Sequence, residues 1–343
     1  MLSLIGVIIS FVLSAWLTWR FCDPASRFHI LDHPNERSLH AQPVPRSGGL
    51  AILAGIGLGL VLPTWRVGQD GNFLWLSLSI LMVATVSYID DRHHVPVIAR
   101  LSAHMIAAGL LLWTGLSVRI VDIAGFEFSL PTTLGTILSL IFIVWMINLY
   151  NFMDGMDGFA GGMAVIGFGA LALLGWQAGN FLFVSLNLIA AAAAAGFLIF
   201  NFPPARIFMG DVGSSTLGLL AAAFSLWGAR DSVFPFWVAV LVFSPFIADA
   251  TATLLRRLWR REKFWQAHRT HYYQQLAQTG WGHRKTVLLE YSVMLGCGIT
   301  ALWAVHVPEK LQVALLIGWA LFYFAFFVWV SRLAARHHRT GTL

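Results

Sequence analysis

The sequence predicts an all-α, polytopic integral membrane protein with about eleven transmembrane helices. Its mean hydropathy of +0.72 and its 58% content of hydrophobic residues are far above those of a soluble protein. Only 11% of the residues are charged, whereas soluble domains have about a quarter. Apolar stretches of about 20 residues, the length that crosses a bilayer core as a helix, recur along the whole chain.

These stretches define eleven expected spans separated by short polar connections. The first has no Lys or Arg before it, so we expect a retained helix and not a cleaved signal peptide. No repeat of about 20 to 50 residues and no linker-like segment is visible, so residues 1–343 are expected to form a single domain. The expected spans cover residues 2–19, 48–65, 73–89, 97–116, 134–150, 159–177, 181–200, 213–228, 233–255, 287–306 and 311–330.

The distribution of Lys and Arg predicts the orientation, because cytoplasmic loops of membrane proteins accumulate these residues. All but four of the 22 Lys and Arg lie on the side reached after the odd-numbered spans. We therefore expect the amino terminus outside and the carboxyl terminus in the cytoplasm, and we attribute the net charge of +6 to this topology. Nothing in the sequence supports nucleic-acid binding. Neither Cys22 nor Cys297 is placed for a disulfide.

Carboxylates and amides gather at the ends of odd-numbered spans, on the expected cytoplasmic side. A carboxylate costs about 2.5 to 3.5 kcal/mol at mid-membrane, so acids beside spans require a reason. They would repel one another and the negative ends of the helix dipoles unless a cation lay among them. Oxygen ligands without a Cys or His cluster are typical of Mg²⁺ or Ca²⁺, and with phosphates as natural co-ligands we expect Mg²⁺. These residues are Asp90, Asp91, Asn151, Asp154, Asp157, Asp211 and Asp249.

Two glycine-containing segments open later spans, VPRSGG at 44–49 and MGDVGSS at 209–215. Their glycines free backbone N–H groups at a helix amino end, where anions are favoured. Each signal is weak alone, because Gly-Gly at the start of a membrane helix more often allows close packing.

The stretch NLYNFMDGMDG at 148–158 has a polar side chain at every third position: Asn148, Asn151, Asp154 and Asp157. A solvated turn is the simplest interpretation, but a turn does not require two amides and two carboxylates in this spacing. In an α-helix steps of three residues spread over about half the circumference, and in a 3₁₀-helix they align. We predict that the four side chains line one concave arc.

The long connection at 256–285 combines eight Lys and Arg with His268, His271 and His283. Its RRLWRRE part is explained by membrane topology alone. The AHRTHYY part, residues 267–273, offers His, Arg and Tyr donors suited to phosphate oxygens.

Five of these segments occur together and in one order. On them the chain resembles the polyprenyl-phosphate N-acetylhexosamine-1-phosphate transferase family, glycosyltransferase family 4, which includes the bacterial translocase that starts peptidoglycan lipid synthesis. Each motif alone is modest, but five in register are highly specific. The matching segments are DHPNERSLHAQPVPRSGG (32–49), IDDR (89–92), NLYNFMDGMDG (148–158), NFPPARIFMGDVGS (201–214) and HRTH (268–271).

The resemblance implies an Mg²⁺-dependent enzyme that moves a sugar-1-phosphate from a UDP-N-acetylhexosamine to polyprenyl (undecaprenyl) phosphate and releases UMP. The reaction would start a cell-surface glycan such as O-antigen lipopolysaccharide or a cell-wall polymer. The resemblance places the protein in the bacterial inner (plasma) membrane, with active-site motifs facing the cytoplasm and the lipid bilayer as partner. The sugar, the glycan and the oligomeric state, a homodimer included, are left open.

Site residues follow from the matched motif positions. Asp90 and Asp91 match the pair assigned to the lipid phosphate and catalysis. Asp211 and Asn151 would hold Mg²⁺, and Asp157 would contact the uracil base. The other implied positions are Asp154, Gly48 and Gly49 for the nucleotide sugar, and Arg100, Arg269 and His271 for phosphate.

The chain departs from the family where some members have a further histidine pair. Tyr273 and Gln274 stand at those positions, so only Arg269 and His271 carry over from that segment. This departure puts the role of a histidine pair, and the identity of the sugar, in doubt.

Two other functions are weighed against the transferase. An intramembrane aspartyl protease also has two aspartates near helix ends, one in a Gly-x-Gly-Asp motif, but Phe208 occupies the first glycine position. A membrane transporter is expected to have broken helices with polar residues near the midplane and an internal pseudo-repeat. Here the acids gather at span ends on one face.

Overall fold

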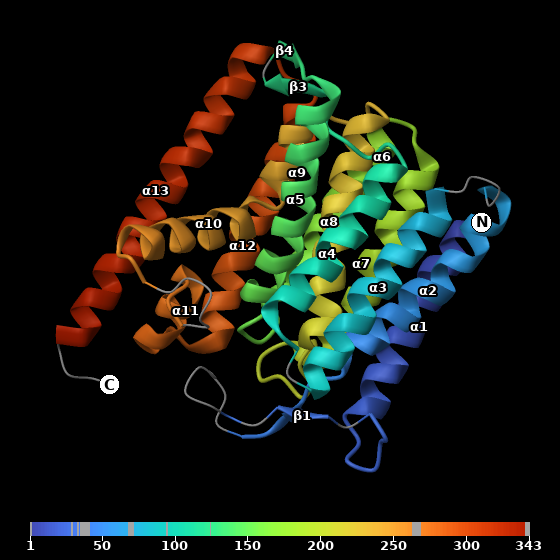
Figure 1. The fold of residues 1–343 in the computed structure, drawn as a ribbon. Coiled ribbons are helices and arrows are strands. Elements are labelled where there is room, and N and C mark those ends of the chain that lie inside the picture. The colour runs from blue at the N-terminus through green and yellow to red at the C-terminus, as the bar shows by residue number, and fades with distance from the viewer. Residues whose placement is uncertain are drawn as a thin grey trace.

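A computed structural model describes residues 2–28, 30–32, 34, 42–67, 72–93, 95–123, 125–262 and 269–339. It is a bundle of long helices with two small antiparallel hairpins (Figure 1). The hairpins are β1 (Leu31–Asp32) with β2 (Val44–Pro45), and β3 (Ile120–Ile123) with β4 (Phe126–Ser129). The helices are α1 (Leu2–Phe21), α2 (Gly48–Val67), α3 (Asn72–Arg92), α4 (Val97–Trp113), α5 (Thr132–Met153), α6 (Phe159–Gln177), α7 (Phe181–Asn201), α8 (Gly210–Arg230), α9 (Phe236–Val242), α10 (Ser244–Trp259), α11 (Tyr272–Leu276), α12 (Gly282–Ala304) and α13 (Glu309–Arg339), with a π-helical turn, η1, at Ala277–Trp281.

The helices confirm the all-α membrane class. Within the described residues, eight helices are long and apolar enough to cross a membrane, and α9 with α10 makes a ninth as a bent pair. The apolar part of α2 and the whole of α4 are shorter. Each of the eleven predicted spans coincides with one of these helices or with the bent pair. The number of crossings and the orientation stay predictions.

The ninth predicted span, 233–255, is not one continuous helix. The chain bends by 80° between α9 and α10. Pro245, in the first turn of α10, has no N–H with which to continue the hydrogen bonds of α9, and it is well suited to begin a new helix. As a result α10 crosses the bundle direction and points toward α13 (Figure 1).

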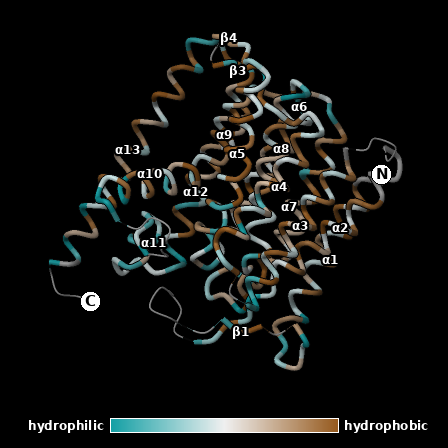
Figure 2. The backbone as a smooth tube through the Cα atoms, in the orientation of Figure 1, coloured by the Kyte–Doolittle hydropathy of each residue, from teal (hydrophilic) through white to brown (hydrophobic). Residues whose placement is uncertain are grey.

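Several of the polar side chains lie inside the helix ends, whereas Asp154 and Asp157 lie on the loop after α5. Asp90 and Asp91 belong to the last turn of α3, and Asn151 to the last turn of α5. Asp211 belongs to the first turn of α8. Figure 2 shows hydrophobic residues along the lengths of the helices and hydrophilic ones gathered toward the end near β1 and α11. The predicted spans therefore end a few residues too early on this side.

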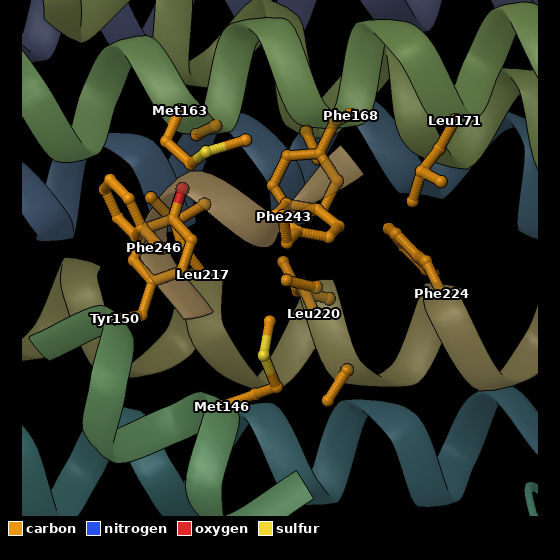
Figure 3. Packing of buried hydrophobic residues seen from close by; sticks show 14 of the residues in the cluster. Met146, Tyr150, Met163, Phe168, Leu171, Leu217, Leu220, Phe224, Phe243 and Phe246 are labelled. Atoms are coloured by element: carbon orange, nitrogen blue, oxygen red, sulfur yellow. The ribbon is translucent and has the colours of Figure 1, made fainter. Parts of the chain in front are cut away.

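Helix α8 is the centre of the bundle, because 94% of its apolar window is buried. Its side chains Leu217, Leu220 and Phe224 meet aromatic residues from the surrounding helices in Figure 3. Tyr150 of α5 packs edge-on to Phe246 of α10, with ring centroids 5.0 Å apart. By contrast, only 6% of the α13 window is buried, and that helix stands apart from the bundle in Figure 1. The rigid core therefore surrounds the helix that begins with Asp211.

A glycine sets the distance between α8 and α5. A Cβ atom added at Gly218 would lie 2.5 Å from the Met146 carbonyl oxygen and 2.9 Å from the Ile147 Cα. Small residues at such crossings let two membrane helices approach backbone to backbone.

We predict that Gly218→Val lowers the free energy of unfolding by about 1–3 kcal/mol, because the added methyl groups force α8 away from α5. Thermal denaturation of the detergent-purified protein measures this change. Gly57→Val is the matched control, since a Cβ atom at Gly57 meets nothing within 4 Å. Equal denaturation midpoints for the two variants would contradict the prediction.

Candidate active site

The charged ends of α3, α4 and α8 meet at one point. The Arg100 guanidinium of α4 pairs with the Asp90 carboxylate of α3, and its Nη1 lies 3.7 Å from Asp211 Oδ2 of α8. The other Asp90 oxygen accepts the Val95 N–H at 2.8 Å. Arg100 thus links two carboxylates that lie 121 positions apart along the chain.

Asp91 caps the start of α8. Its two carboxylate oxygens accept the N–H groups of Asp211 and Val212, each at 3.3 Å. Arg46 lies beside it, with Nη1 3.8 Å from Asp91 Oδ1, and also donates to the Asp91 carbonyl oxygen. The carboxylate therefore satisfies the positive end of α8 and holds Arg46 in the site. Arg46 is part of the VPRSGG segment, but its role was not predicted from the sequence.

Asn151 and Asp211 lie side by side at the facing ends of α5 and α8. The Asn151 amide donates to the Ser214 hydroxyl at 3.0 Å, and it is also within hydrogen-bonding reach of the Asp211 carboxylate. Asp90 lies within the same reach of Asp211. Two carboxyl groups this close require a proton or a cation between them.

Asp154 follows the last residue of α5 and faces the same cluster. Burial, followed by the charges of Asp211, Asp91 and Asp157, raises the pKa of the Asp154 carboxyl well above its usual range. Among the described residues its side chain has no hydrogen-bond or ion-pair partner. Burial and these neighbouring charges therefore disfavour the ionised form of Asp154 unless a cation binds beside it.

Asp157 is held by two segments that the sequence did not connect to it. Its Oδ2 accepts the Ala205 N–H at 3.0 Å, and its Oδ1 lies 3.0 Å from His283 Nδ1 at the start of α12. The following residue, Gly158, adopts a φ of +75°, a conformation that favours glycine, and starts α6. His283 was noticed in the sequence only as one histidine of a basic connection, because its partner lies 126 positions away.

The predicted glycines lie next to the cluster and pack helices. The N–H of Gly48 donates to the Phe208 carbonyl at 3.0 Å, and that of Gly49 to the Met209 carbonyl at 2.7 Å. A Cβ atom at Gly49 would fall on the backbone of Gly213. Both N–H groups are thus used within the protein, and a contact of these glycines with a nucleotide sugar stays a prediction.

Gly210 makes the turn that directs Asp211 into the site. Its φ is +72°, and a Cβ atom there would collide with the Arg46 carbonyl oxygen and lie 3.0 Å from Asp91 Oδ2. Only glycine fits both the conformation and the space at this position.

The contacts described for Arg269 and His271 are with residues outside the carboxylate cluster. His271 is buried, and its Nδ1 lies 3.2 Å from Asp249 Oδ1 of α10. Arg269 lines a separate cavity with Arg256, Arg260 and other residues, none of them acidic. His268, the first residue of the HRTH motif, lies outside the described residues. Phosphate contacts by Arg269 and His271 stay predictions.

Tyr273 and Gln274 join this segment to the end of α5. Asp249 accepts the N–H groups of Tyr272 at 3.0 Å and Tyr273 at 2.9 Å, which fixes the start of α11. The Tyr273 hydroxyl then donates to the Phe152 carbonyl at 3.3 Å. A Cβ atom at Gly155 would meet both Tyr273 and Gln274, so the two residues border the loop that contains Asp154 and Asp157.

A cavity of about 450 Å³ opens beside the carboxylates. Arg100, Asn151 and Asp211 line one end of it. Most of its wall is apolar and comes from α4, α5 and α10. The apolar lining consists of Val97, Leu101, Met105, Leu140, Ile141, Val144, Trp145, Phe152 and Leu254.

The donor set of the cluster fits a hard cation that shares its coordination with substrate. Within the described residues, no group of three or more His, Cys, Asp or Glu side chains has the geometry to hold a metal ion alone. The Asp211 carboxylate and the Asn151 amide nevertheless provide oxygen ligands beside Asp154. Mg²⁺ is commonly bound through one or two carboxylates, with water and phosphate oxygens completing the octahedron.

Comparison with known proteins identifies the family of the chain. The model of a family described as "Glycosyl transferase family 4" matches residues 73–229. The chain is 30% identical to the decaprenyl-phosphate N-acetylglucosaminephosphotransferase of Mycolicibacterium smegmatis, over 93% of this chain and 86% of the relative. The chain belongs to glycosyl transferase family 4. Other family 4 relatives are the probable undecaprenyl-phosphate N-acetylglucosaminyl 1-phosphate transferase of Bacillus subtilis, 28% identical over 87% of this chain and 85% of the relative, and the phospho-N-acetylmuramoyl-pentapeptide-transferase of Enterococcus faecalis, 30% identical over 50% and 53%.

The family 4 match covers α3 to α8 and so includes the carboxylate cluster. Gly48, Gly49, Arg269 and His271 lie outside the matched residues. Membership in family 4 decides for a transferase and against the protease and transporter alternatives.

We predict that His283→Leu lowers the free energy of unfolding by about 1 kcal/mol, because Asp157 loses one of its two partners. His283→Gln retains a donor at this position and is expected to denature close to the wild-type temperature. Chemical or thermal denaturation of the three proteins in one detergent measures the difference. The prediction fails if the Leu and Gln variants are destabilised equally.

Proposed function

We propose that this family 4 protein transfers an N-acetylhexosamine-1-phosphate from a UDP-sugar to a polyprenyl phosphate and releases UMP. The observation that carries the proposal is the cavity, which joins a charged end at Arg100, Asn151 and Asp211 to an apolar wall. A substrate with a phosphate head and a hydrocarbon tail matches both parts. The Bacillus subtilis and Mycolicibacterium smegmatis relatives act, by their names, on undecaprenyl or decaprenyl phosphate, which supports an acceptor of this class.

The same relatives are named for N-acetylglucosamine, which makes a UDP-N-acetylhexosamine the proposed donor. Asp154 and Asp157, on the loop between α5 and α6, are proposed to bind its nucleotide. The His283 contact would hold the Asp157 carboxyl group in position to accept a hydrogen bond from a base N–H.

Asp211 and Asn151 are proposed to hold Mg²⁺, with the donor's diphosphate supplying further oxygens. When bound, the ion would neutralise the phosphate charge that builds up as the diphosphate is cleaved. Arg100 is placed to stabilise the same charge, since it already lies between Asp90 and Asp211. Asp91 and Arg46 are proposed to act indirectly. They fix the first turn of α8, from which Asp211 projects.

Asp90 is proposed to position the attacking phosphate through Arg100. A phosphate monoester has a second pKa near 6, so a lipid phosphate is largely dianionic at neutral pH. Proton removal by Asp90 or Asp91 is then a secondary contribution, and correct placement of nucleophile and leaving group dominates.

The reaction is proposed to occur at the cytoplasmic face of a bacterial inner membrane and to start a cell-surface glycan such as O-antigen lipopolysaccharide. The basic ends of α10 and α13, with Arg256, Arg257, Arg332 and Arg336, support a cytoplasmic location for their side of the membrane.

We predict that the purified protein releases UMP from at least one UDP-N-acetylhexosamine when polyprenyl phosphate and Mg²⁺ are present. Asp211→Asn is expected to reduce kcat by about 10²–10³-fold, because a preorganised charged group at the reacting phosphate is lost. Asp231→Asn, at the opposite end of α8, is the matched control and should keep wild-type activity. Absence of UMP release with every sugar tested, from folded protein, would refute the proposed reaction.

We predict that Asp90→Asn retains part of the activity and recovers more of it as the pH rises through about 6, where the acceptor phosphate becomes dianionic. A pH–rate profile measured under saturating substrates tests this. Complete loss of activity at every pH, with substrate binding intact, would show instead that Asp90 is an essential base.

A further inference from the structure

The charged and amide side chains of the active site form a first layer, called the charged tier. A second tier of polar side chains lies one helical turn deeper in the cavity. On each of four helices a charged or amide residue of the active site has a neutral polar partner three or four positions further into the span, and such spacing keeps both on one helix face. The second tier is about 4.5–6 Å further along the helix axes. Its members are Ser87 on α3, His104 on α4, Asn148 on α5 and Ser215 on α8, and all four line the cavity.

The two hydroxyls of this tier have no hydrogen-bond partner in the part of the chain that the structure describes. Ser87 and Ser215 are 3% and 4% exposed, and neither hydroxyl makes a hydrogen bond to any described residue. Other buried serines of the same helices behave differently. Ser79 on α3 donates to the Trp75 and Ala107 carbonyls, and Ser225 on α8 donates to the Ala221 carbonyl at 2.6 Å. Among the buried serines described on α3 and α8, the unpartnered hydroxyls are therefore the two in the cavity.

His104 and Asn148 complete the tier with a donor of fixed direction. The Asn148 Nδ2 donates to the Val144 carbonyl at 2.7 Å and lies 3.4 Å from His104 Nδ1. Because Asn148 presents its N–H group, the neutral imidazole accepts at Nδ1 and keeps its proton on Nε2. No described residue accepts from that second nitrogen, so it is available to a molecule in the cavity.

We propose that Ser87, His104 and Ser215, with Asn148 orienting the imidazole, form the seat in which the lipid acceptor's phosphate binds before it attacks. This inference rests on the proposed transferase function and names the residues that receive its second substrate. Uncharged donors suit a phosphate that must approach a site rich in carboxylates, because they solvate its oxygens without adding to the repulsion. Arg100 lies one turn above and provides the nearest positive charge.

The position of the tier also fits the shape of such a substrate. Toward the charged tier the phosphate would meet Arg100 and the reacting diphosphate. In the other direction the cavity wall is apolar, with Leu101, Met105 and Ile141 among its residues, and suits an isoprenoid chain. A UDP-sugar has no comparable apolar part, so the seat is assigned to the acceptor.

Steady-state kinetics with nearly isosteric variants test the proposal. Ser215→Ala and Ser87→Ala should each raise the KM for polyprenyl phosphate about tenfold, the effect of one hydrogen bond to a charged group. The KM for the UDP-sugar and kcat should stay within about twofold. Ser225→Ala and Ser79→Ala, on the same two helices, are the matched controls and should leave all constants unchanged.

Direct binding measurements distinguish recognition of the phosphate by the seat from recognition of the hydrocarbon chain by the apolar wall. Farnesyl phosphate, farnesol and inorganic phosphate are titrated into the purified full-length protein. Ser215→Ala should lower the affinity for farnesyl phosphate about tenfold and leave the affinity for farnesol unchanged. Unchanged affinity for farnesyl phosphate, or an equal loss for farnesol, would overturn the seat. Competition by inorganic phosphate tells whether the phosphate is recognised without its chain.

The kinetic and binding experiments together also distinguish this inference from the proposed function. Dependence of farnesyl phosphate binding on Ser87 and Ser215 without UMP release from wild type would support the seat and refute the transferase reaction. UMP release with wild-type KM values in both serine variants would refute the seat and leave the reaction standing.

Discussion

Concentrated negative charge at the shared end of α3, α5 and α8 is the constraint on which the rest of this structure depends. Asp90, Asp91, Asp154, Asp157 and Asp211 gather there, and α3 and α5 also direct the negative ends of their dipoles toward them. Arg46 and Arg100 compensate part of this charge, and the amino end of α8 compensates more by donating two N–H groups to Asp91. The remainder would favour binding of a divalent cation.

The packing of the bundle holds that charge in place at the border of an apolar cavity. Helix α8 is almost fully enclosed, so Asp211 projects from a rigid element. The bend between α9 and α10 places Asp249 at the start of α11, where it accepts the Tyr273 N–H. The Tyr273 hydroxyl in turn contacts the end of α5. The carboxylate cluster is thereby joined to an apolar wall through one cavity, whose polar tiers change from charged to neutral with depth.

Local periodicity and composition predict much of this arrangement. Apolar length predicted the helices, and the spacing of Asn151, Asp154 and Asp157 predicted a site at the end of α5. Contacts between distant segments could not be predicted, because no local pattern pairs Asp157 with His283 or Asp91 with the N–H groups of α8. The continuous helix expected at 233–255 was wrong for a related reason, since one proline in an apolar run does not show which way the chain bends. His271 matched a motif by sequence, and its side chain contacts Asp249, a partner that no local pattern pairs with it.

The central claim is that the charge imbalance of this cluster creates a divalent-cation site at Asp211 and Asn151. Titration of the purified protein with Mn²⁺, which accepts the same oxygen ligands as Mg²⁺, followed by electron paramagnetic resonance, tests it most directly. The account predicts one bound ion per chain in the wild type and in Asp231→Asn, and at least tenfold weaker binding in Asp211→Asn. Equal binding by the two variants, or no specific binding by the wild type in the presence of a UDP-sugar, would contradict it.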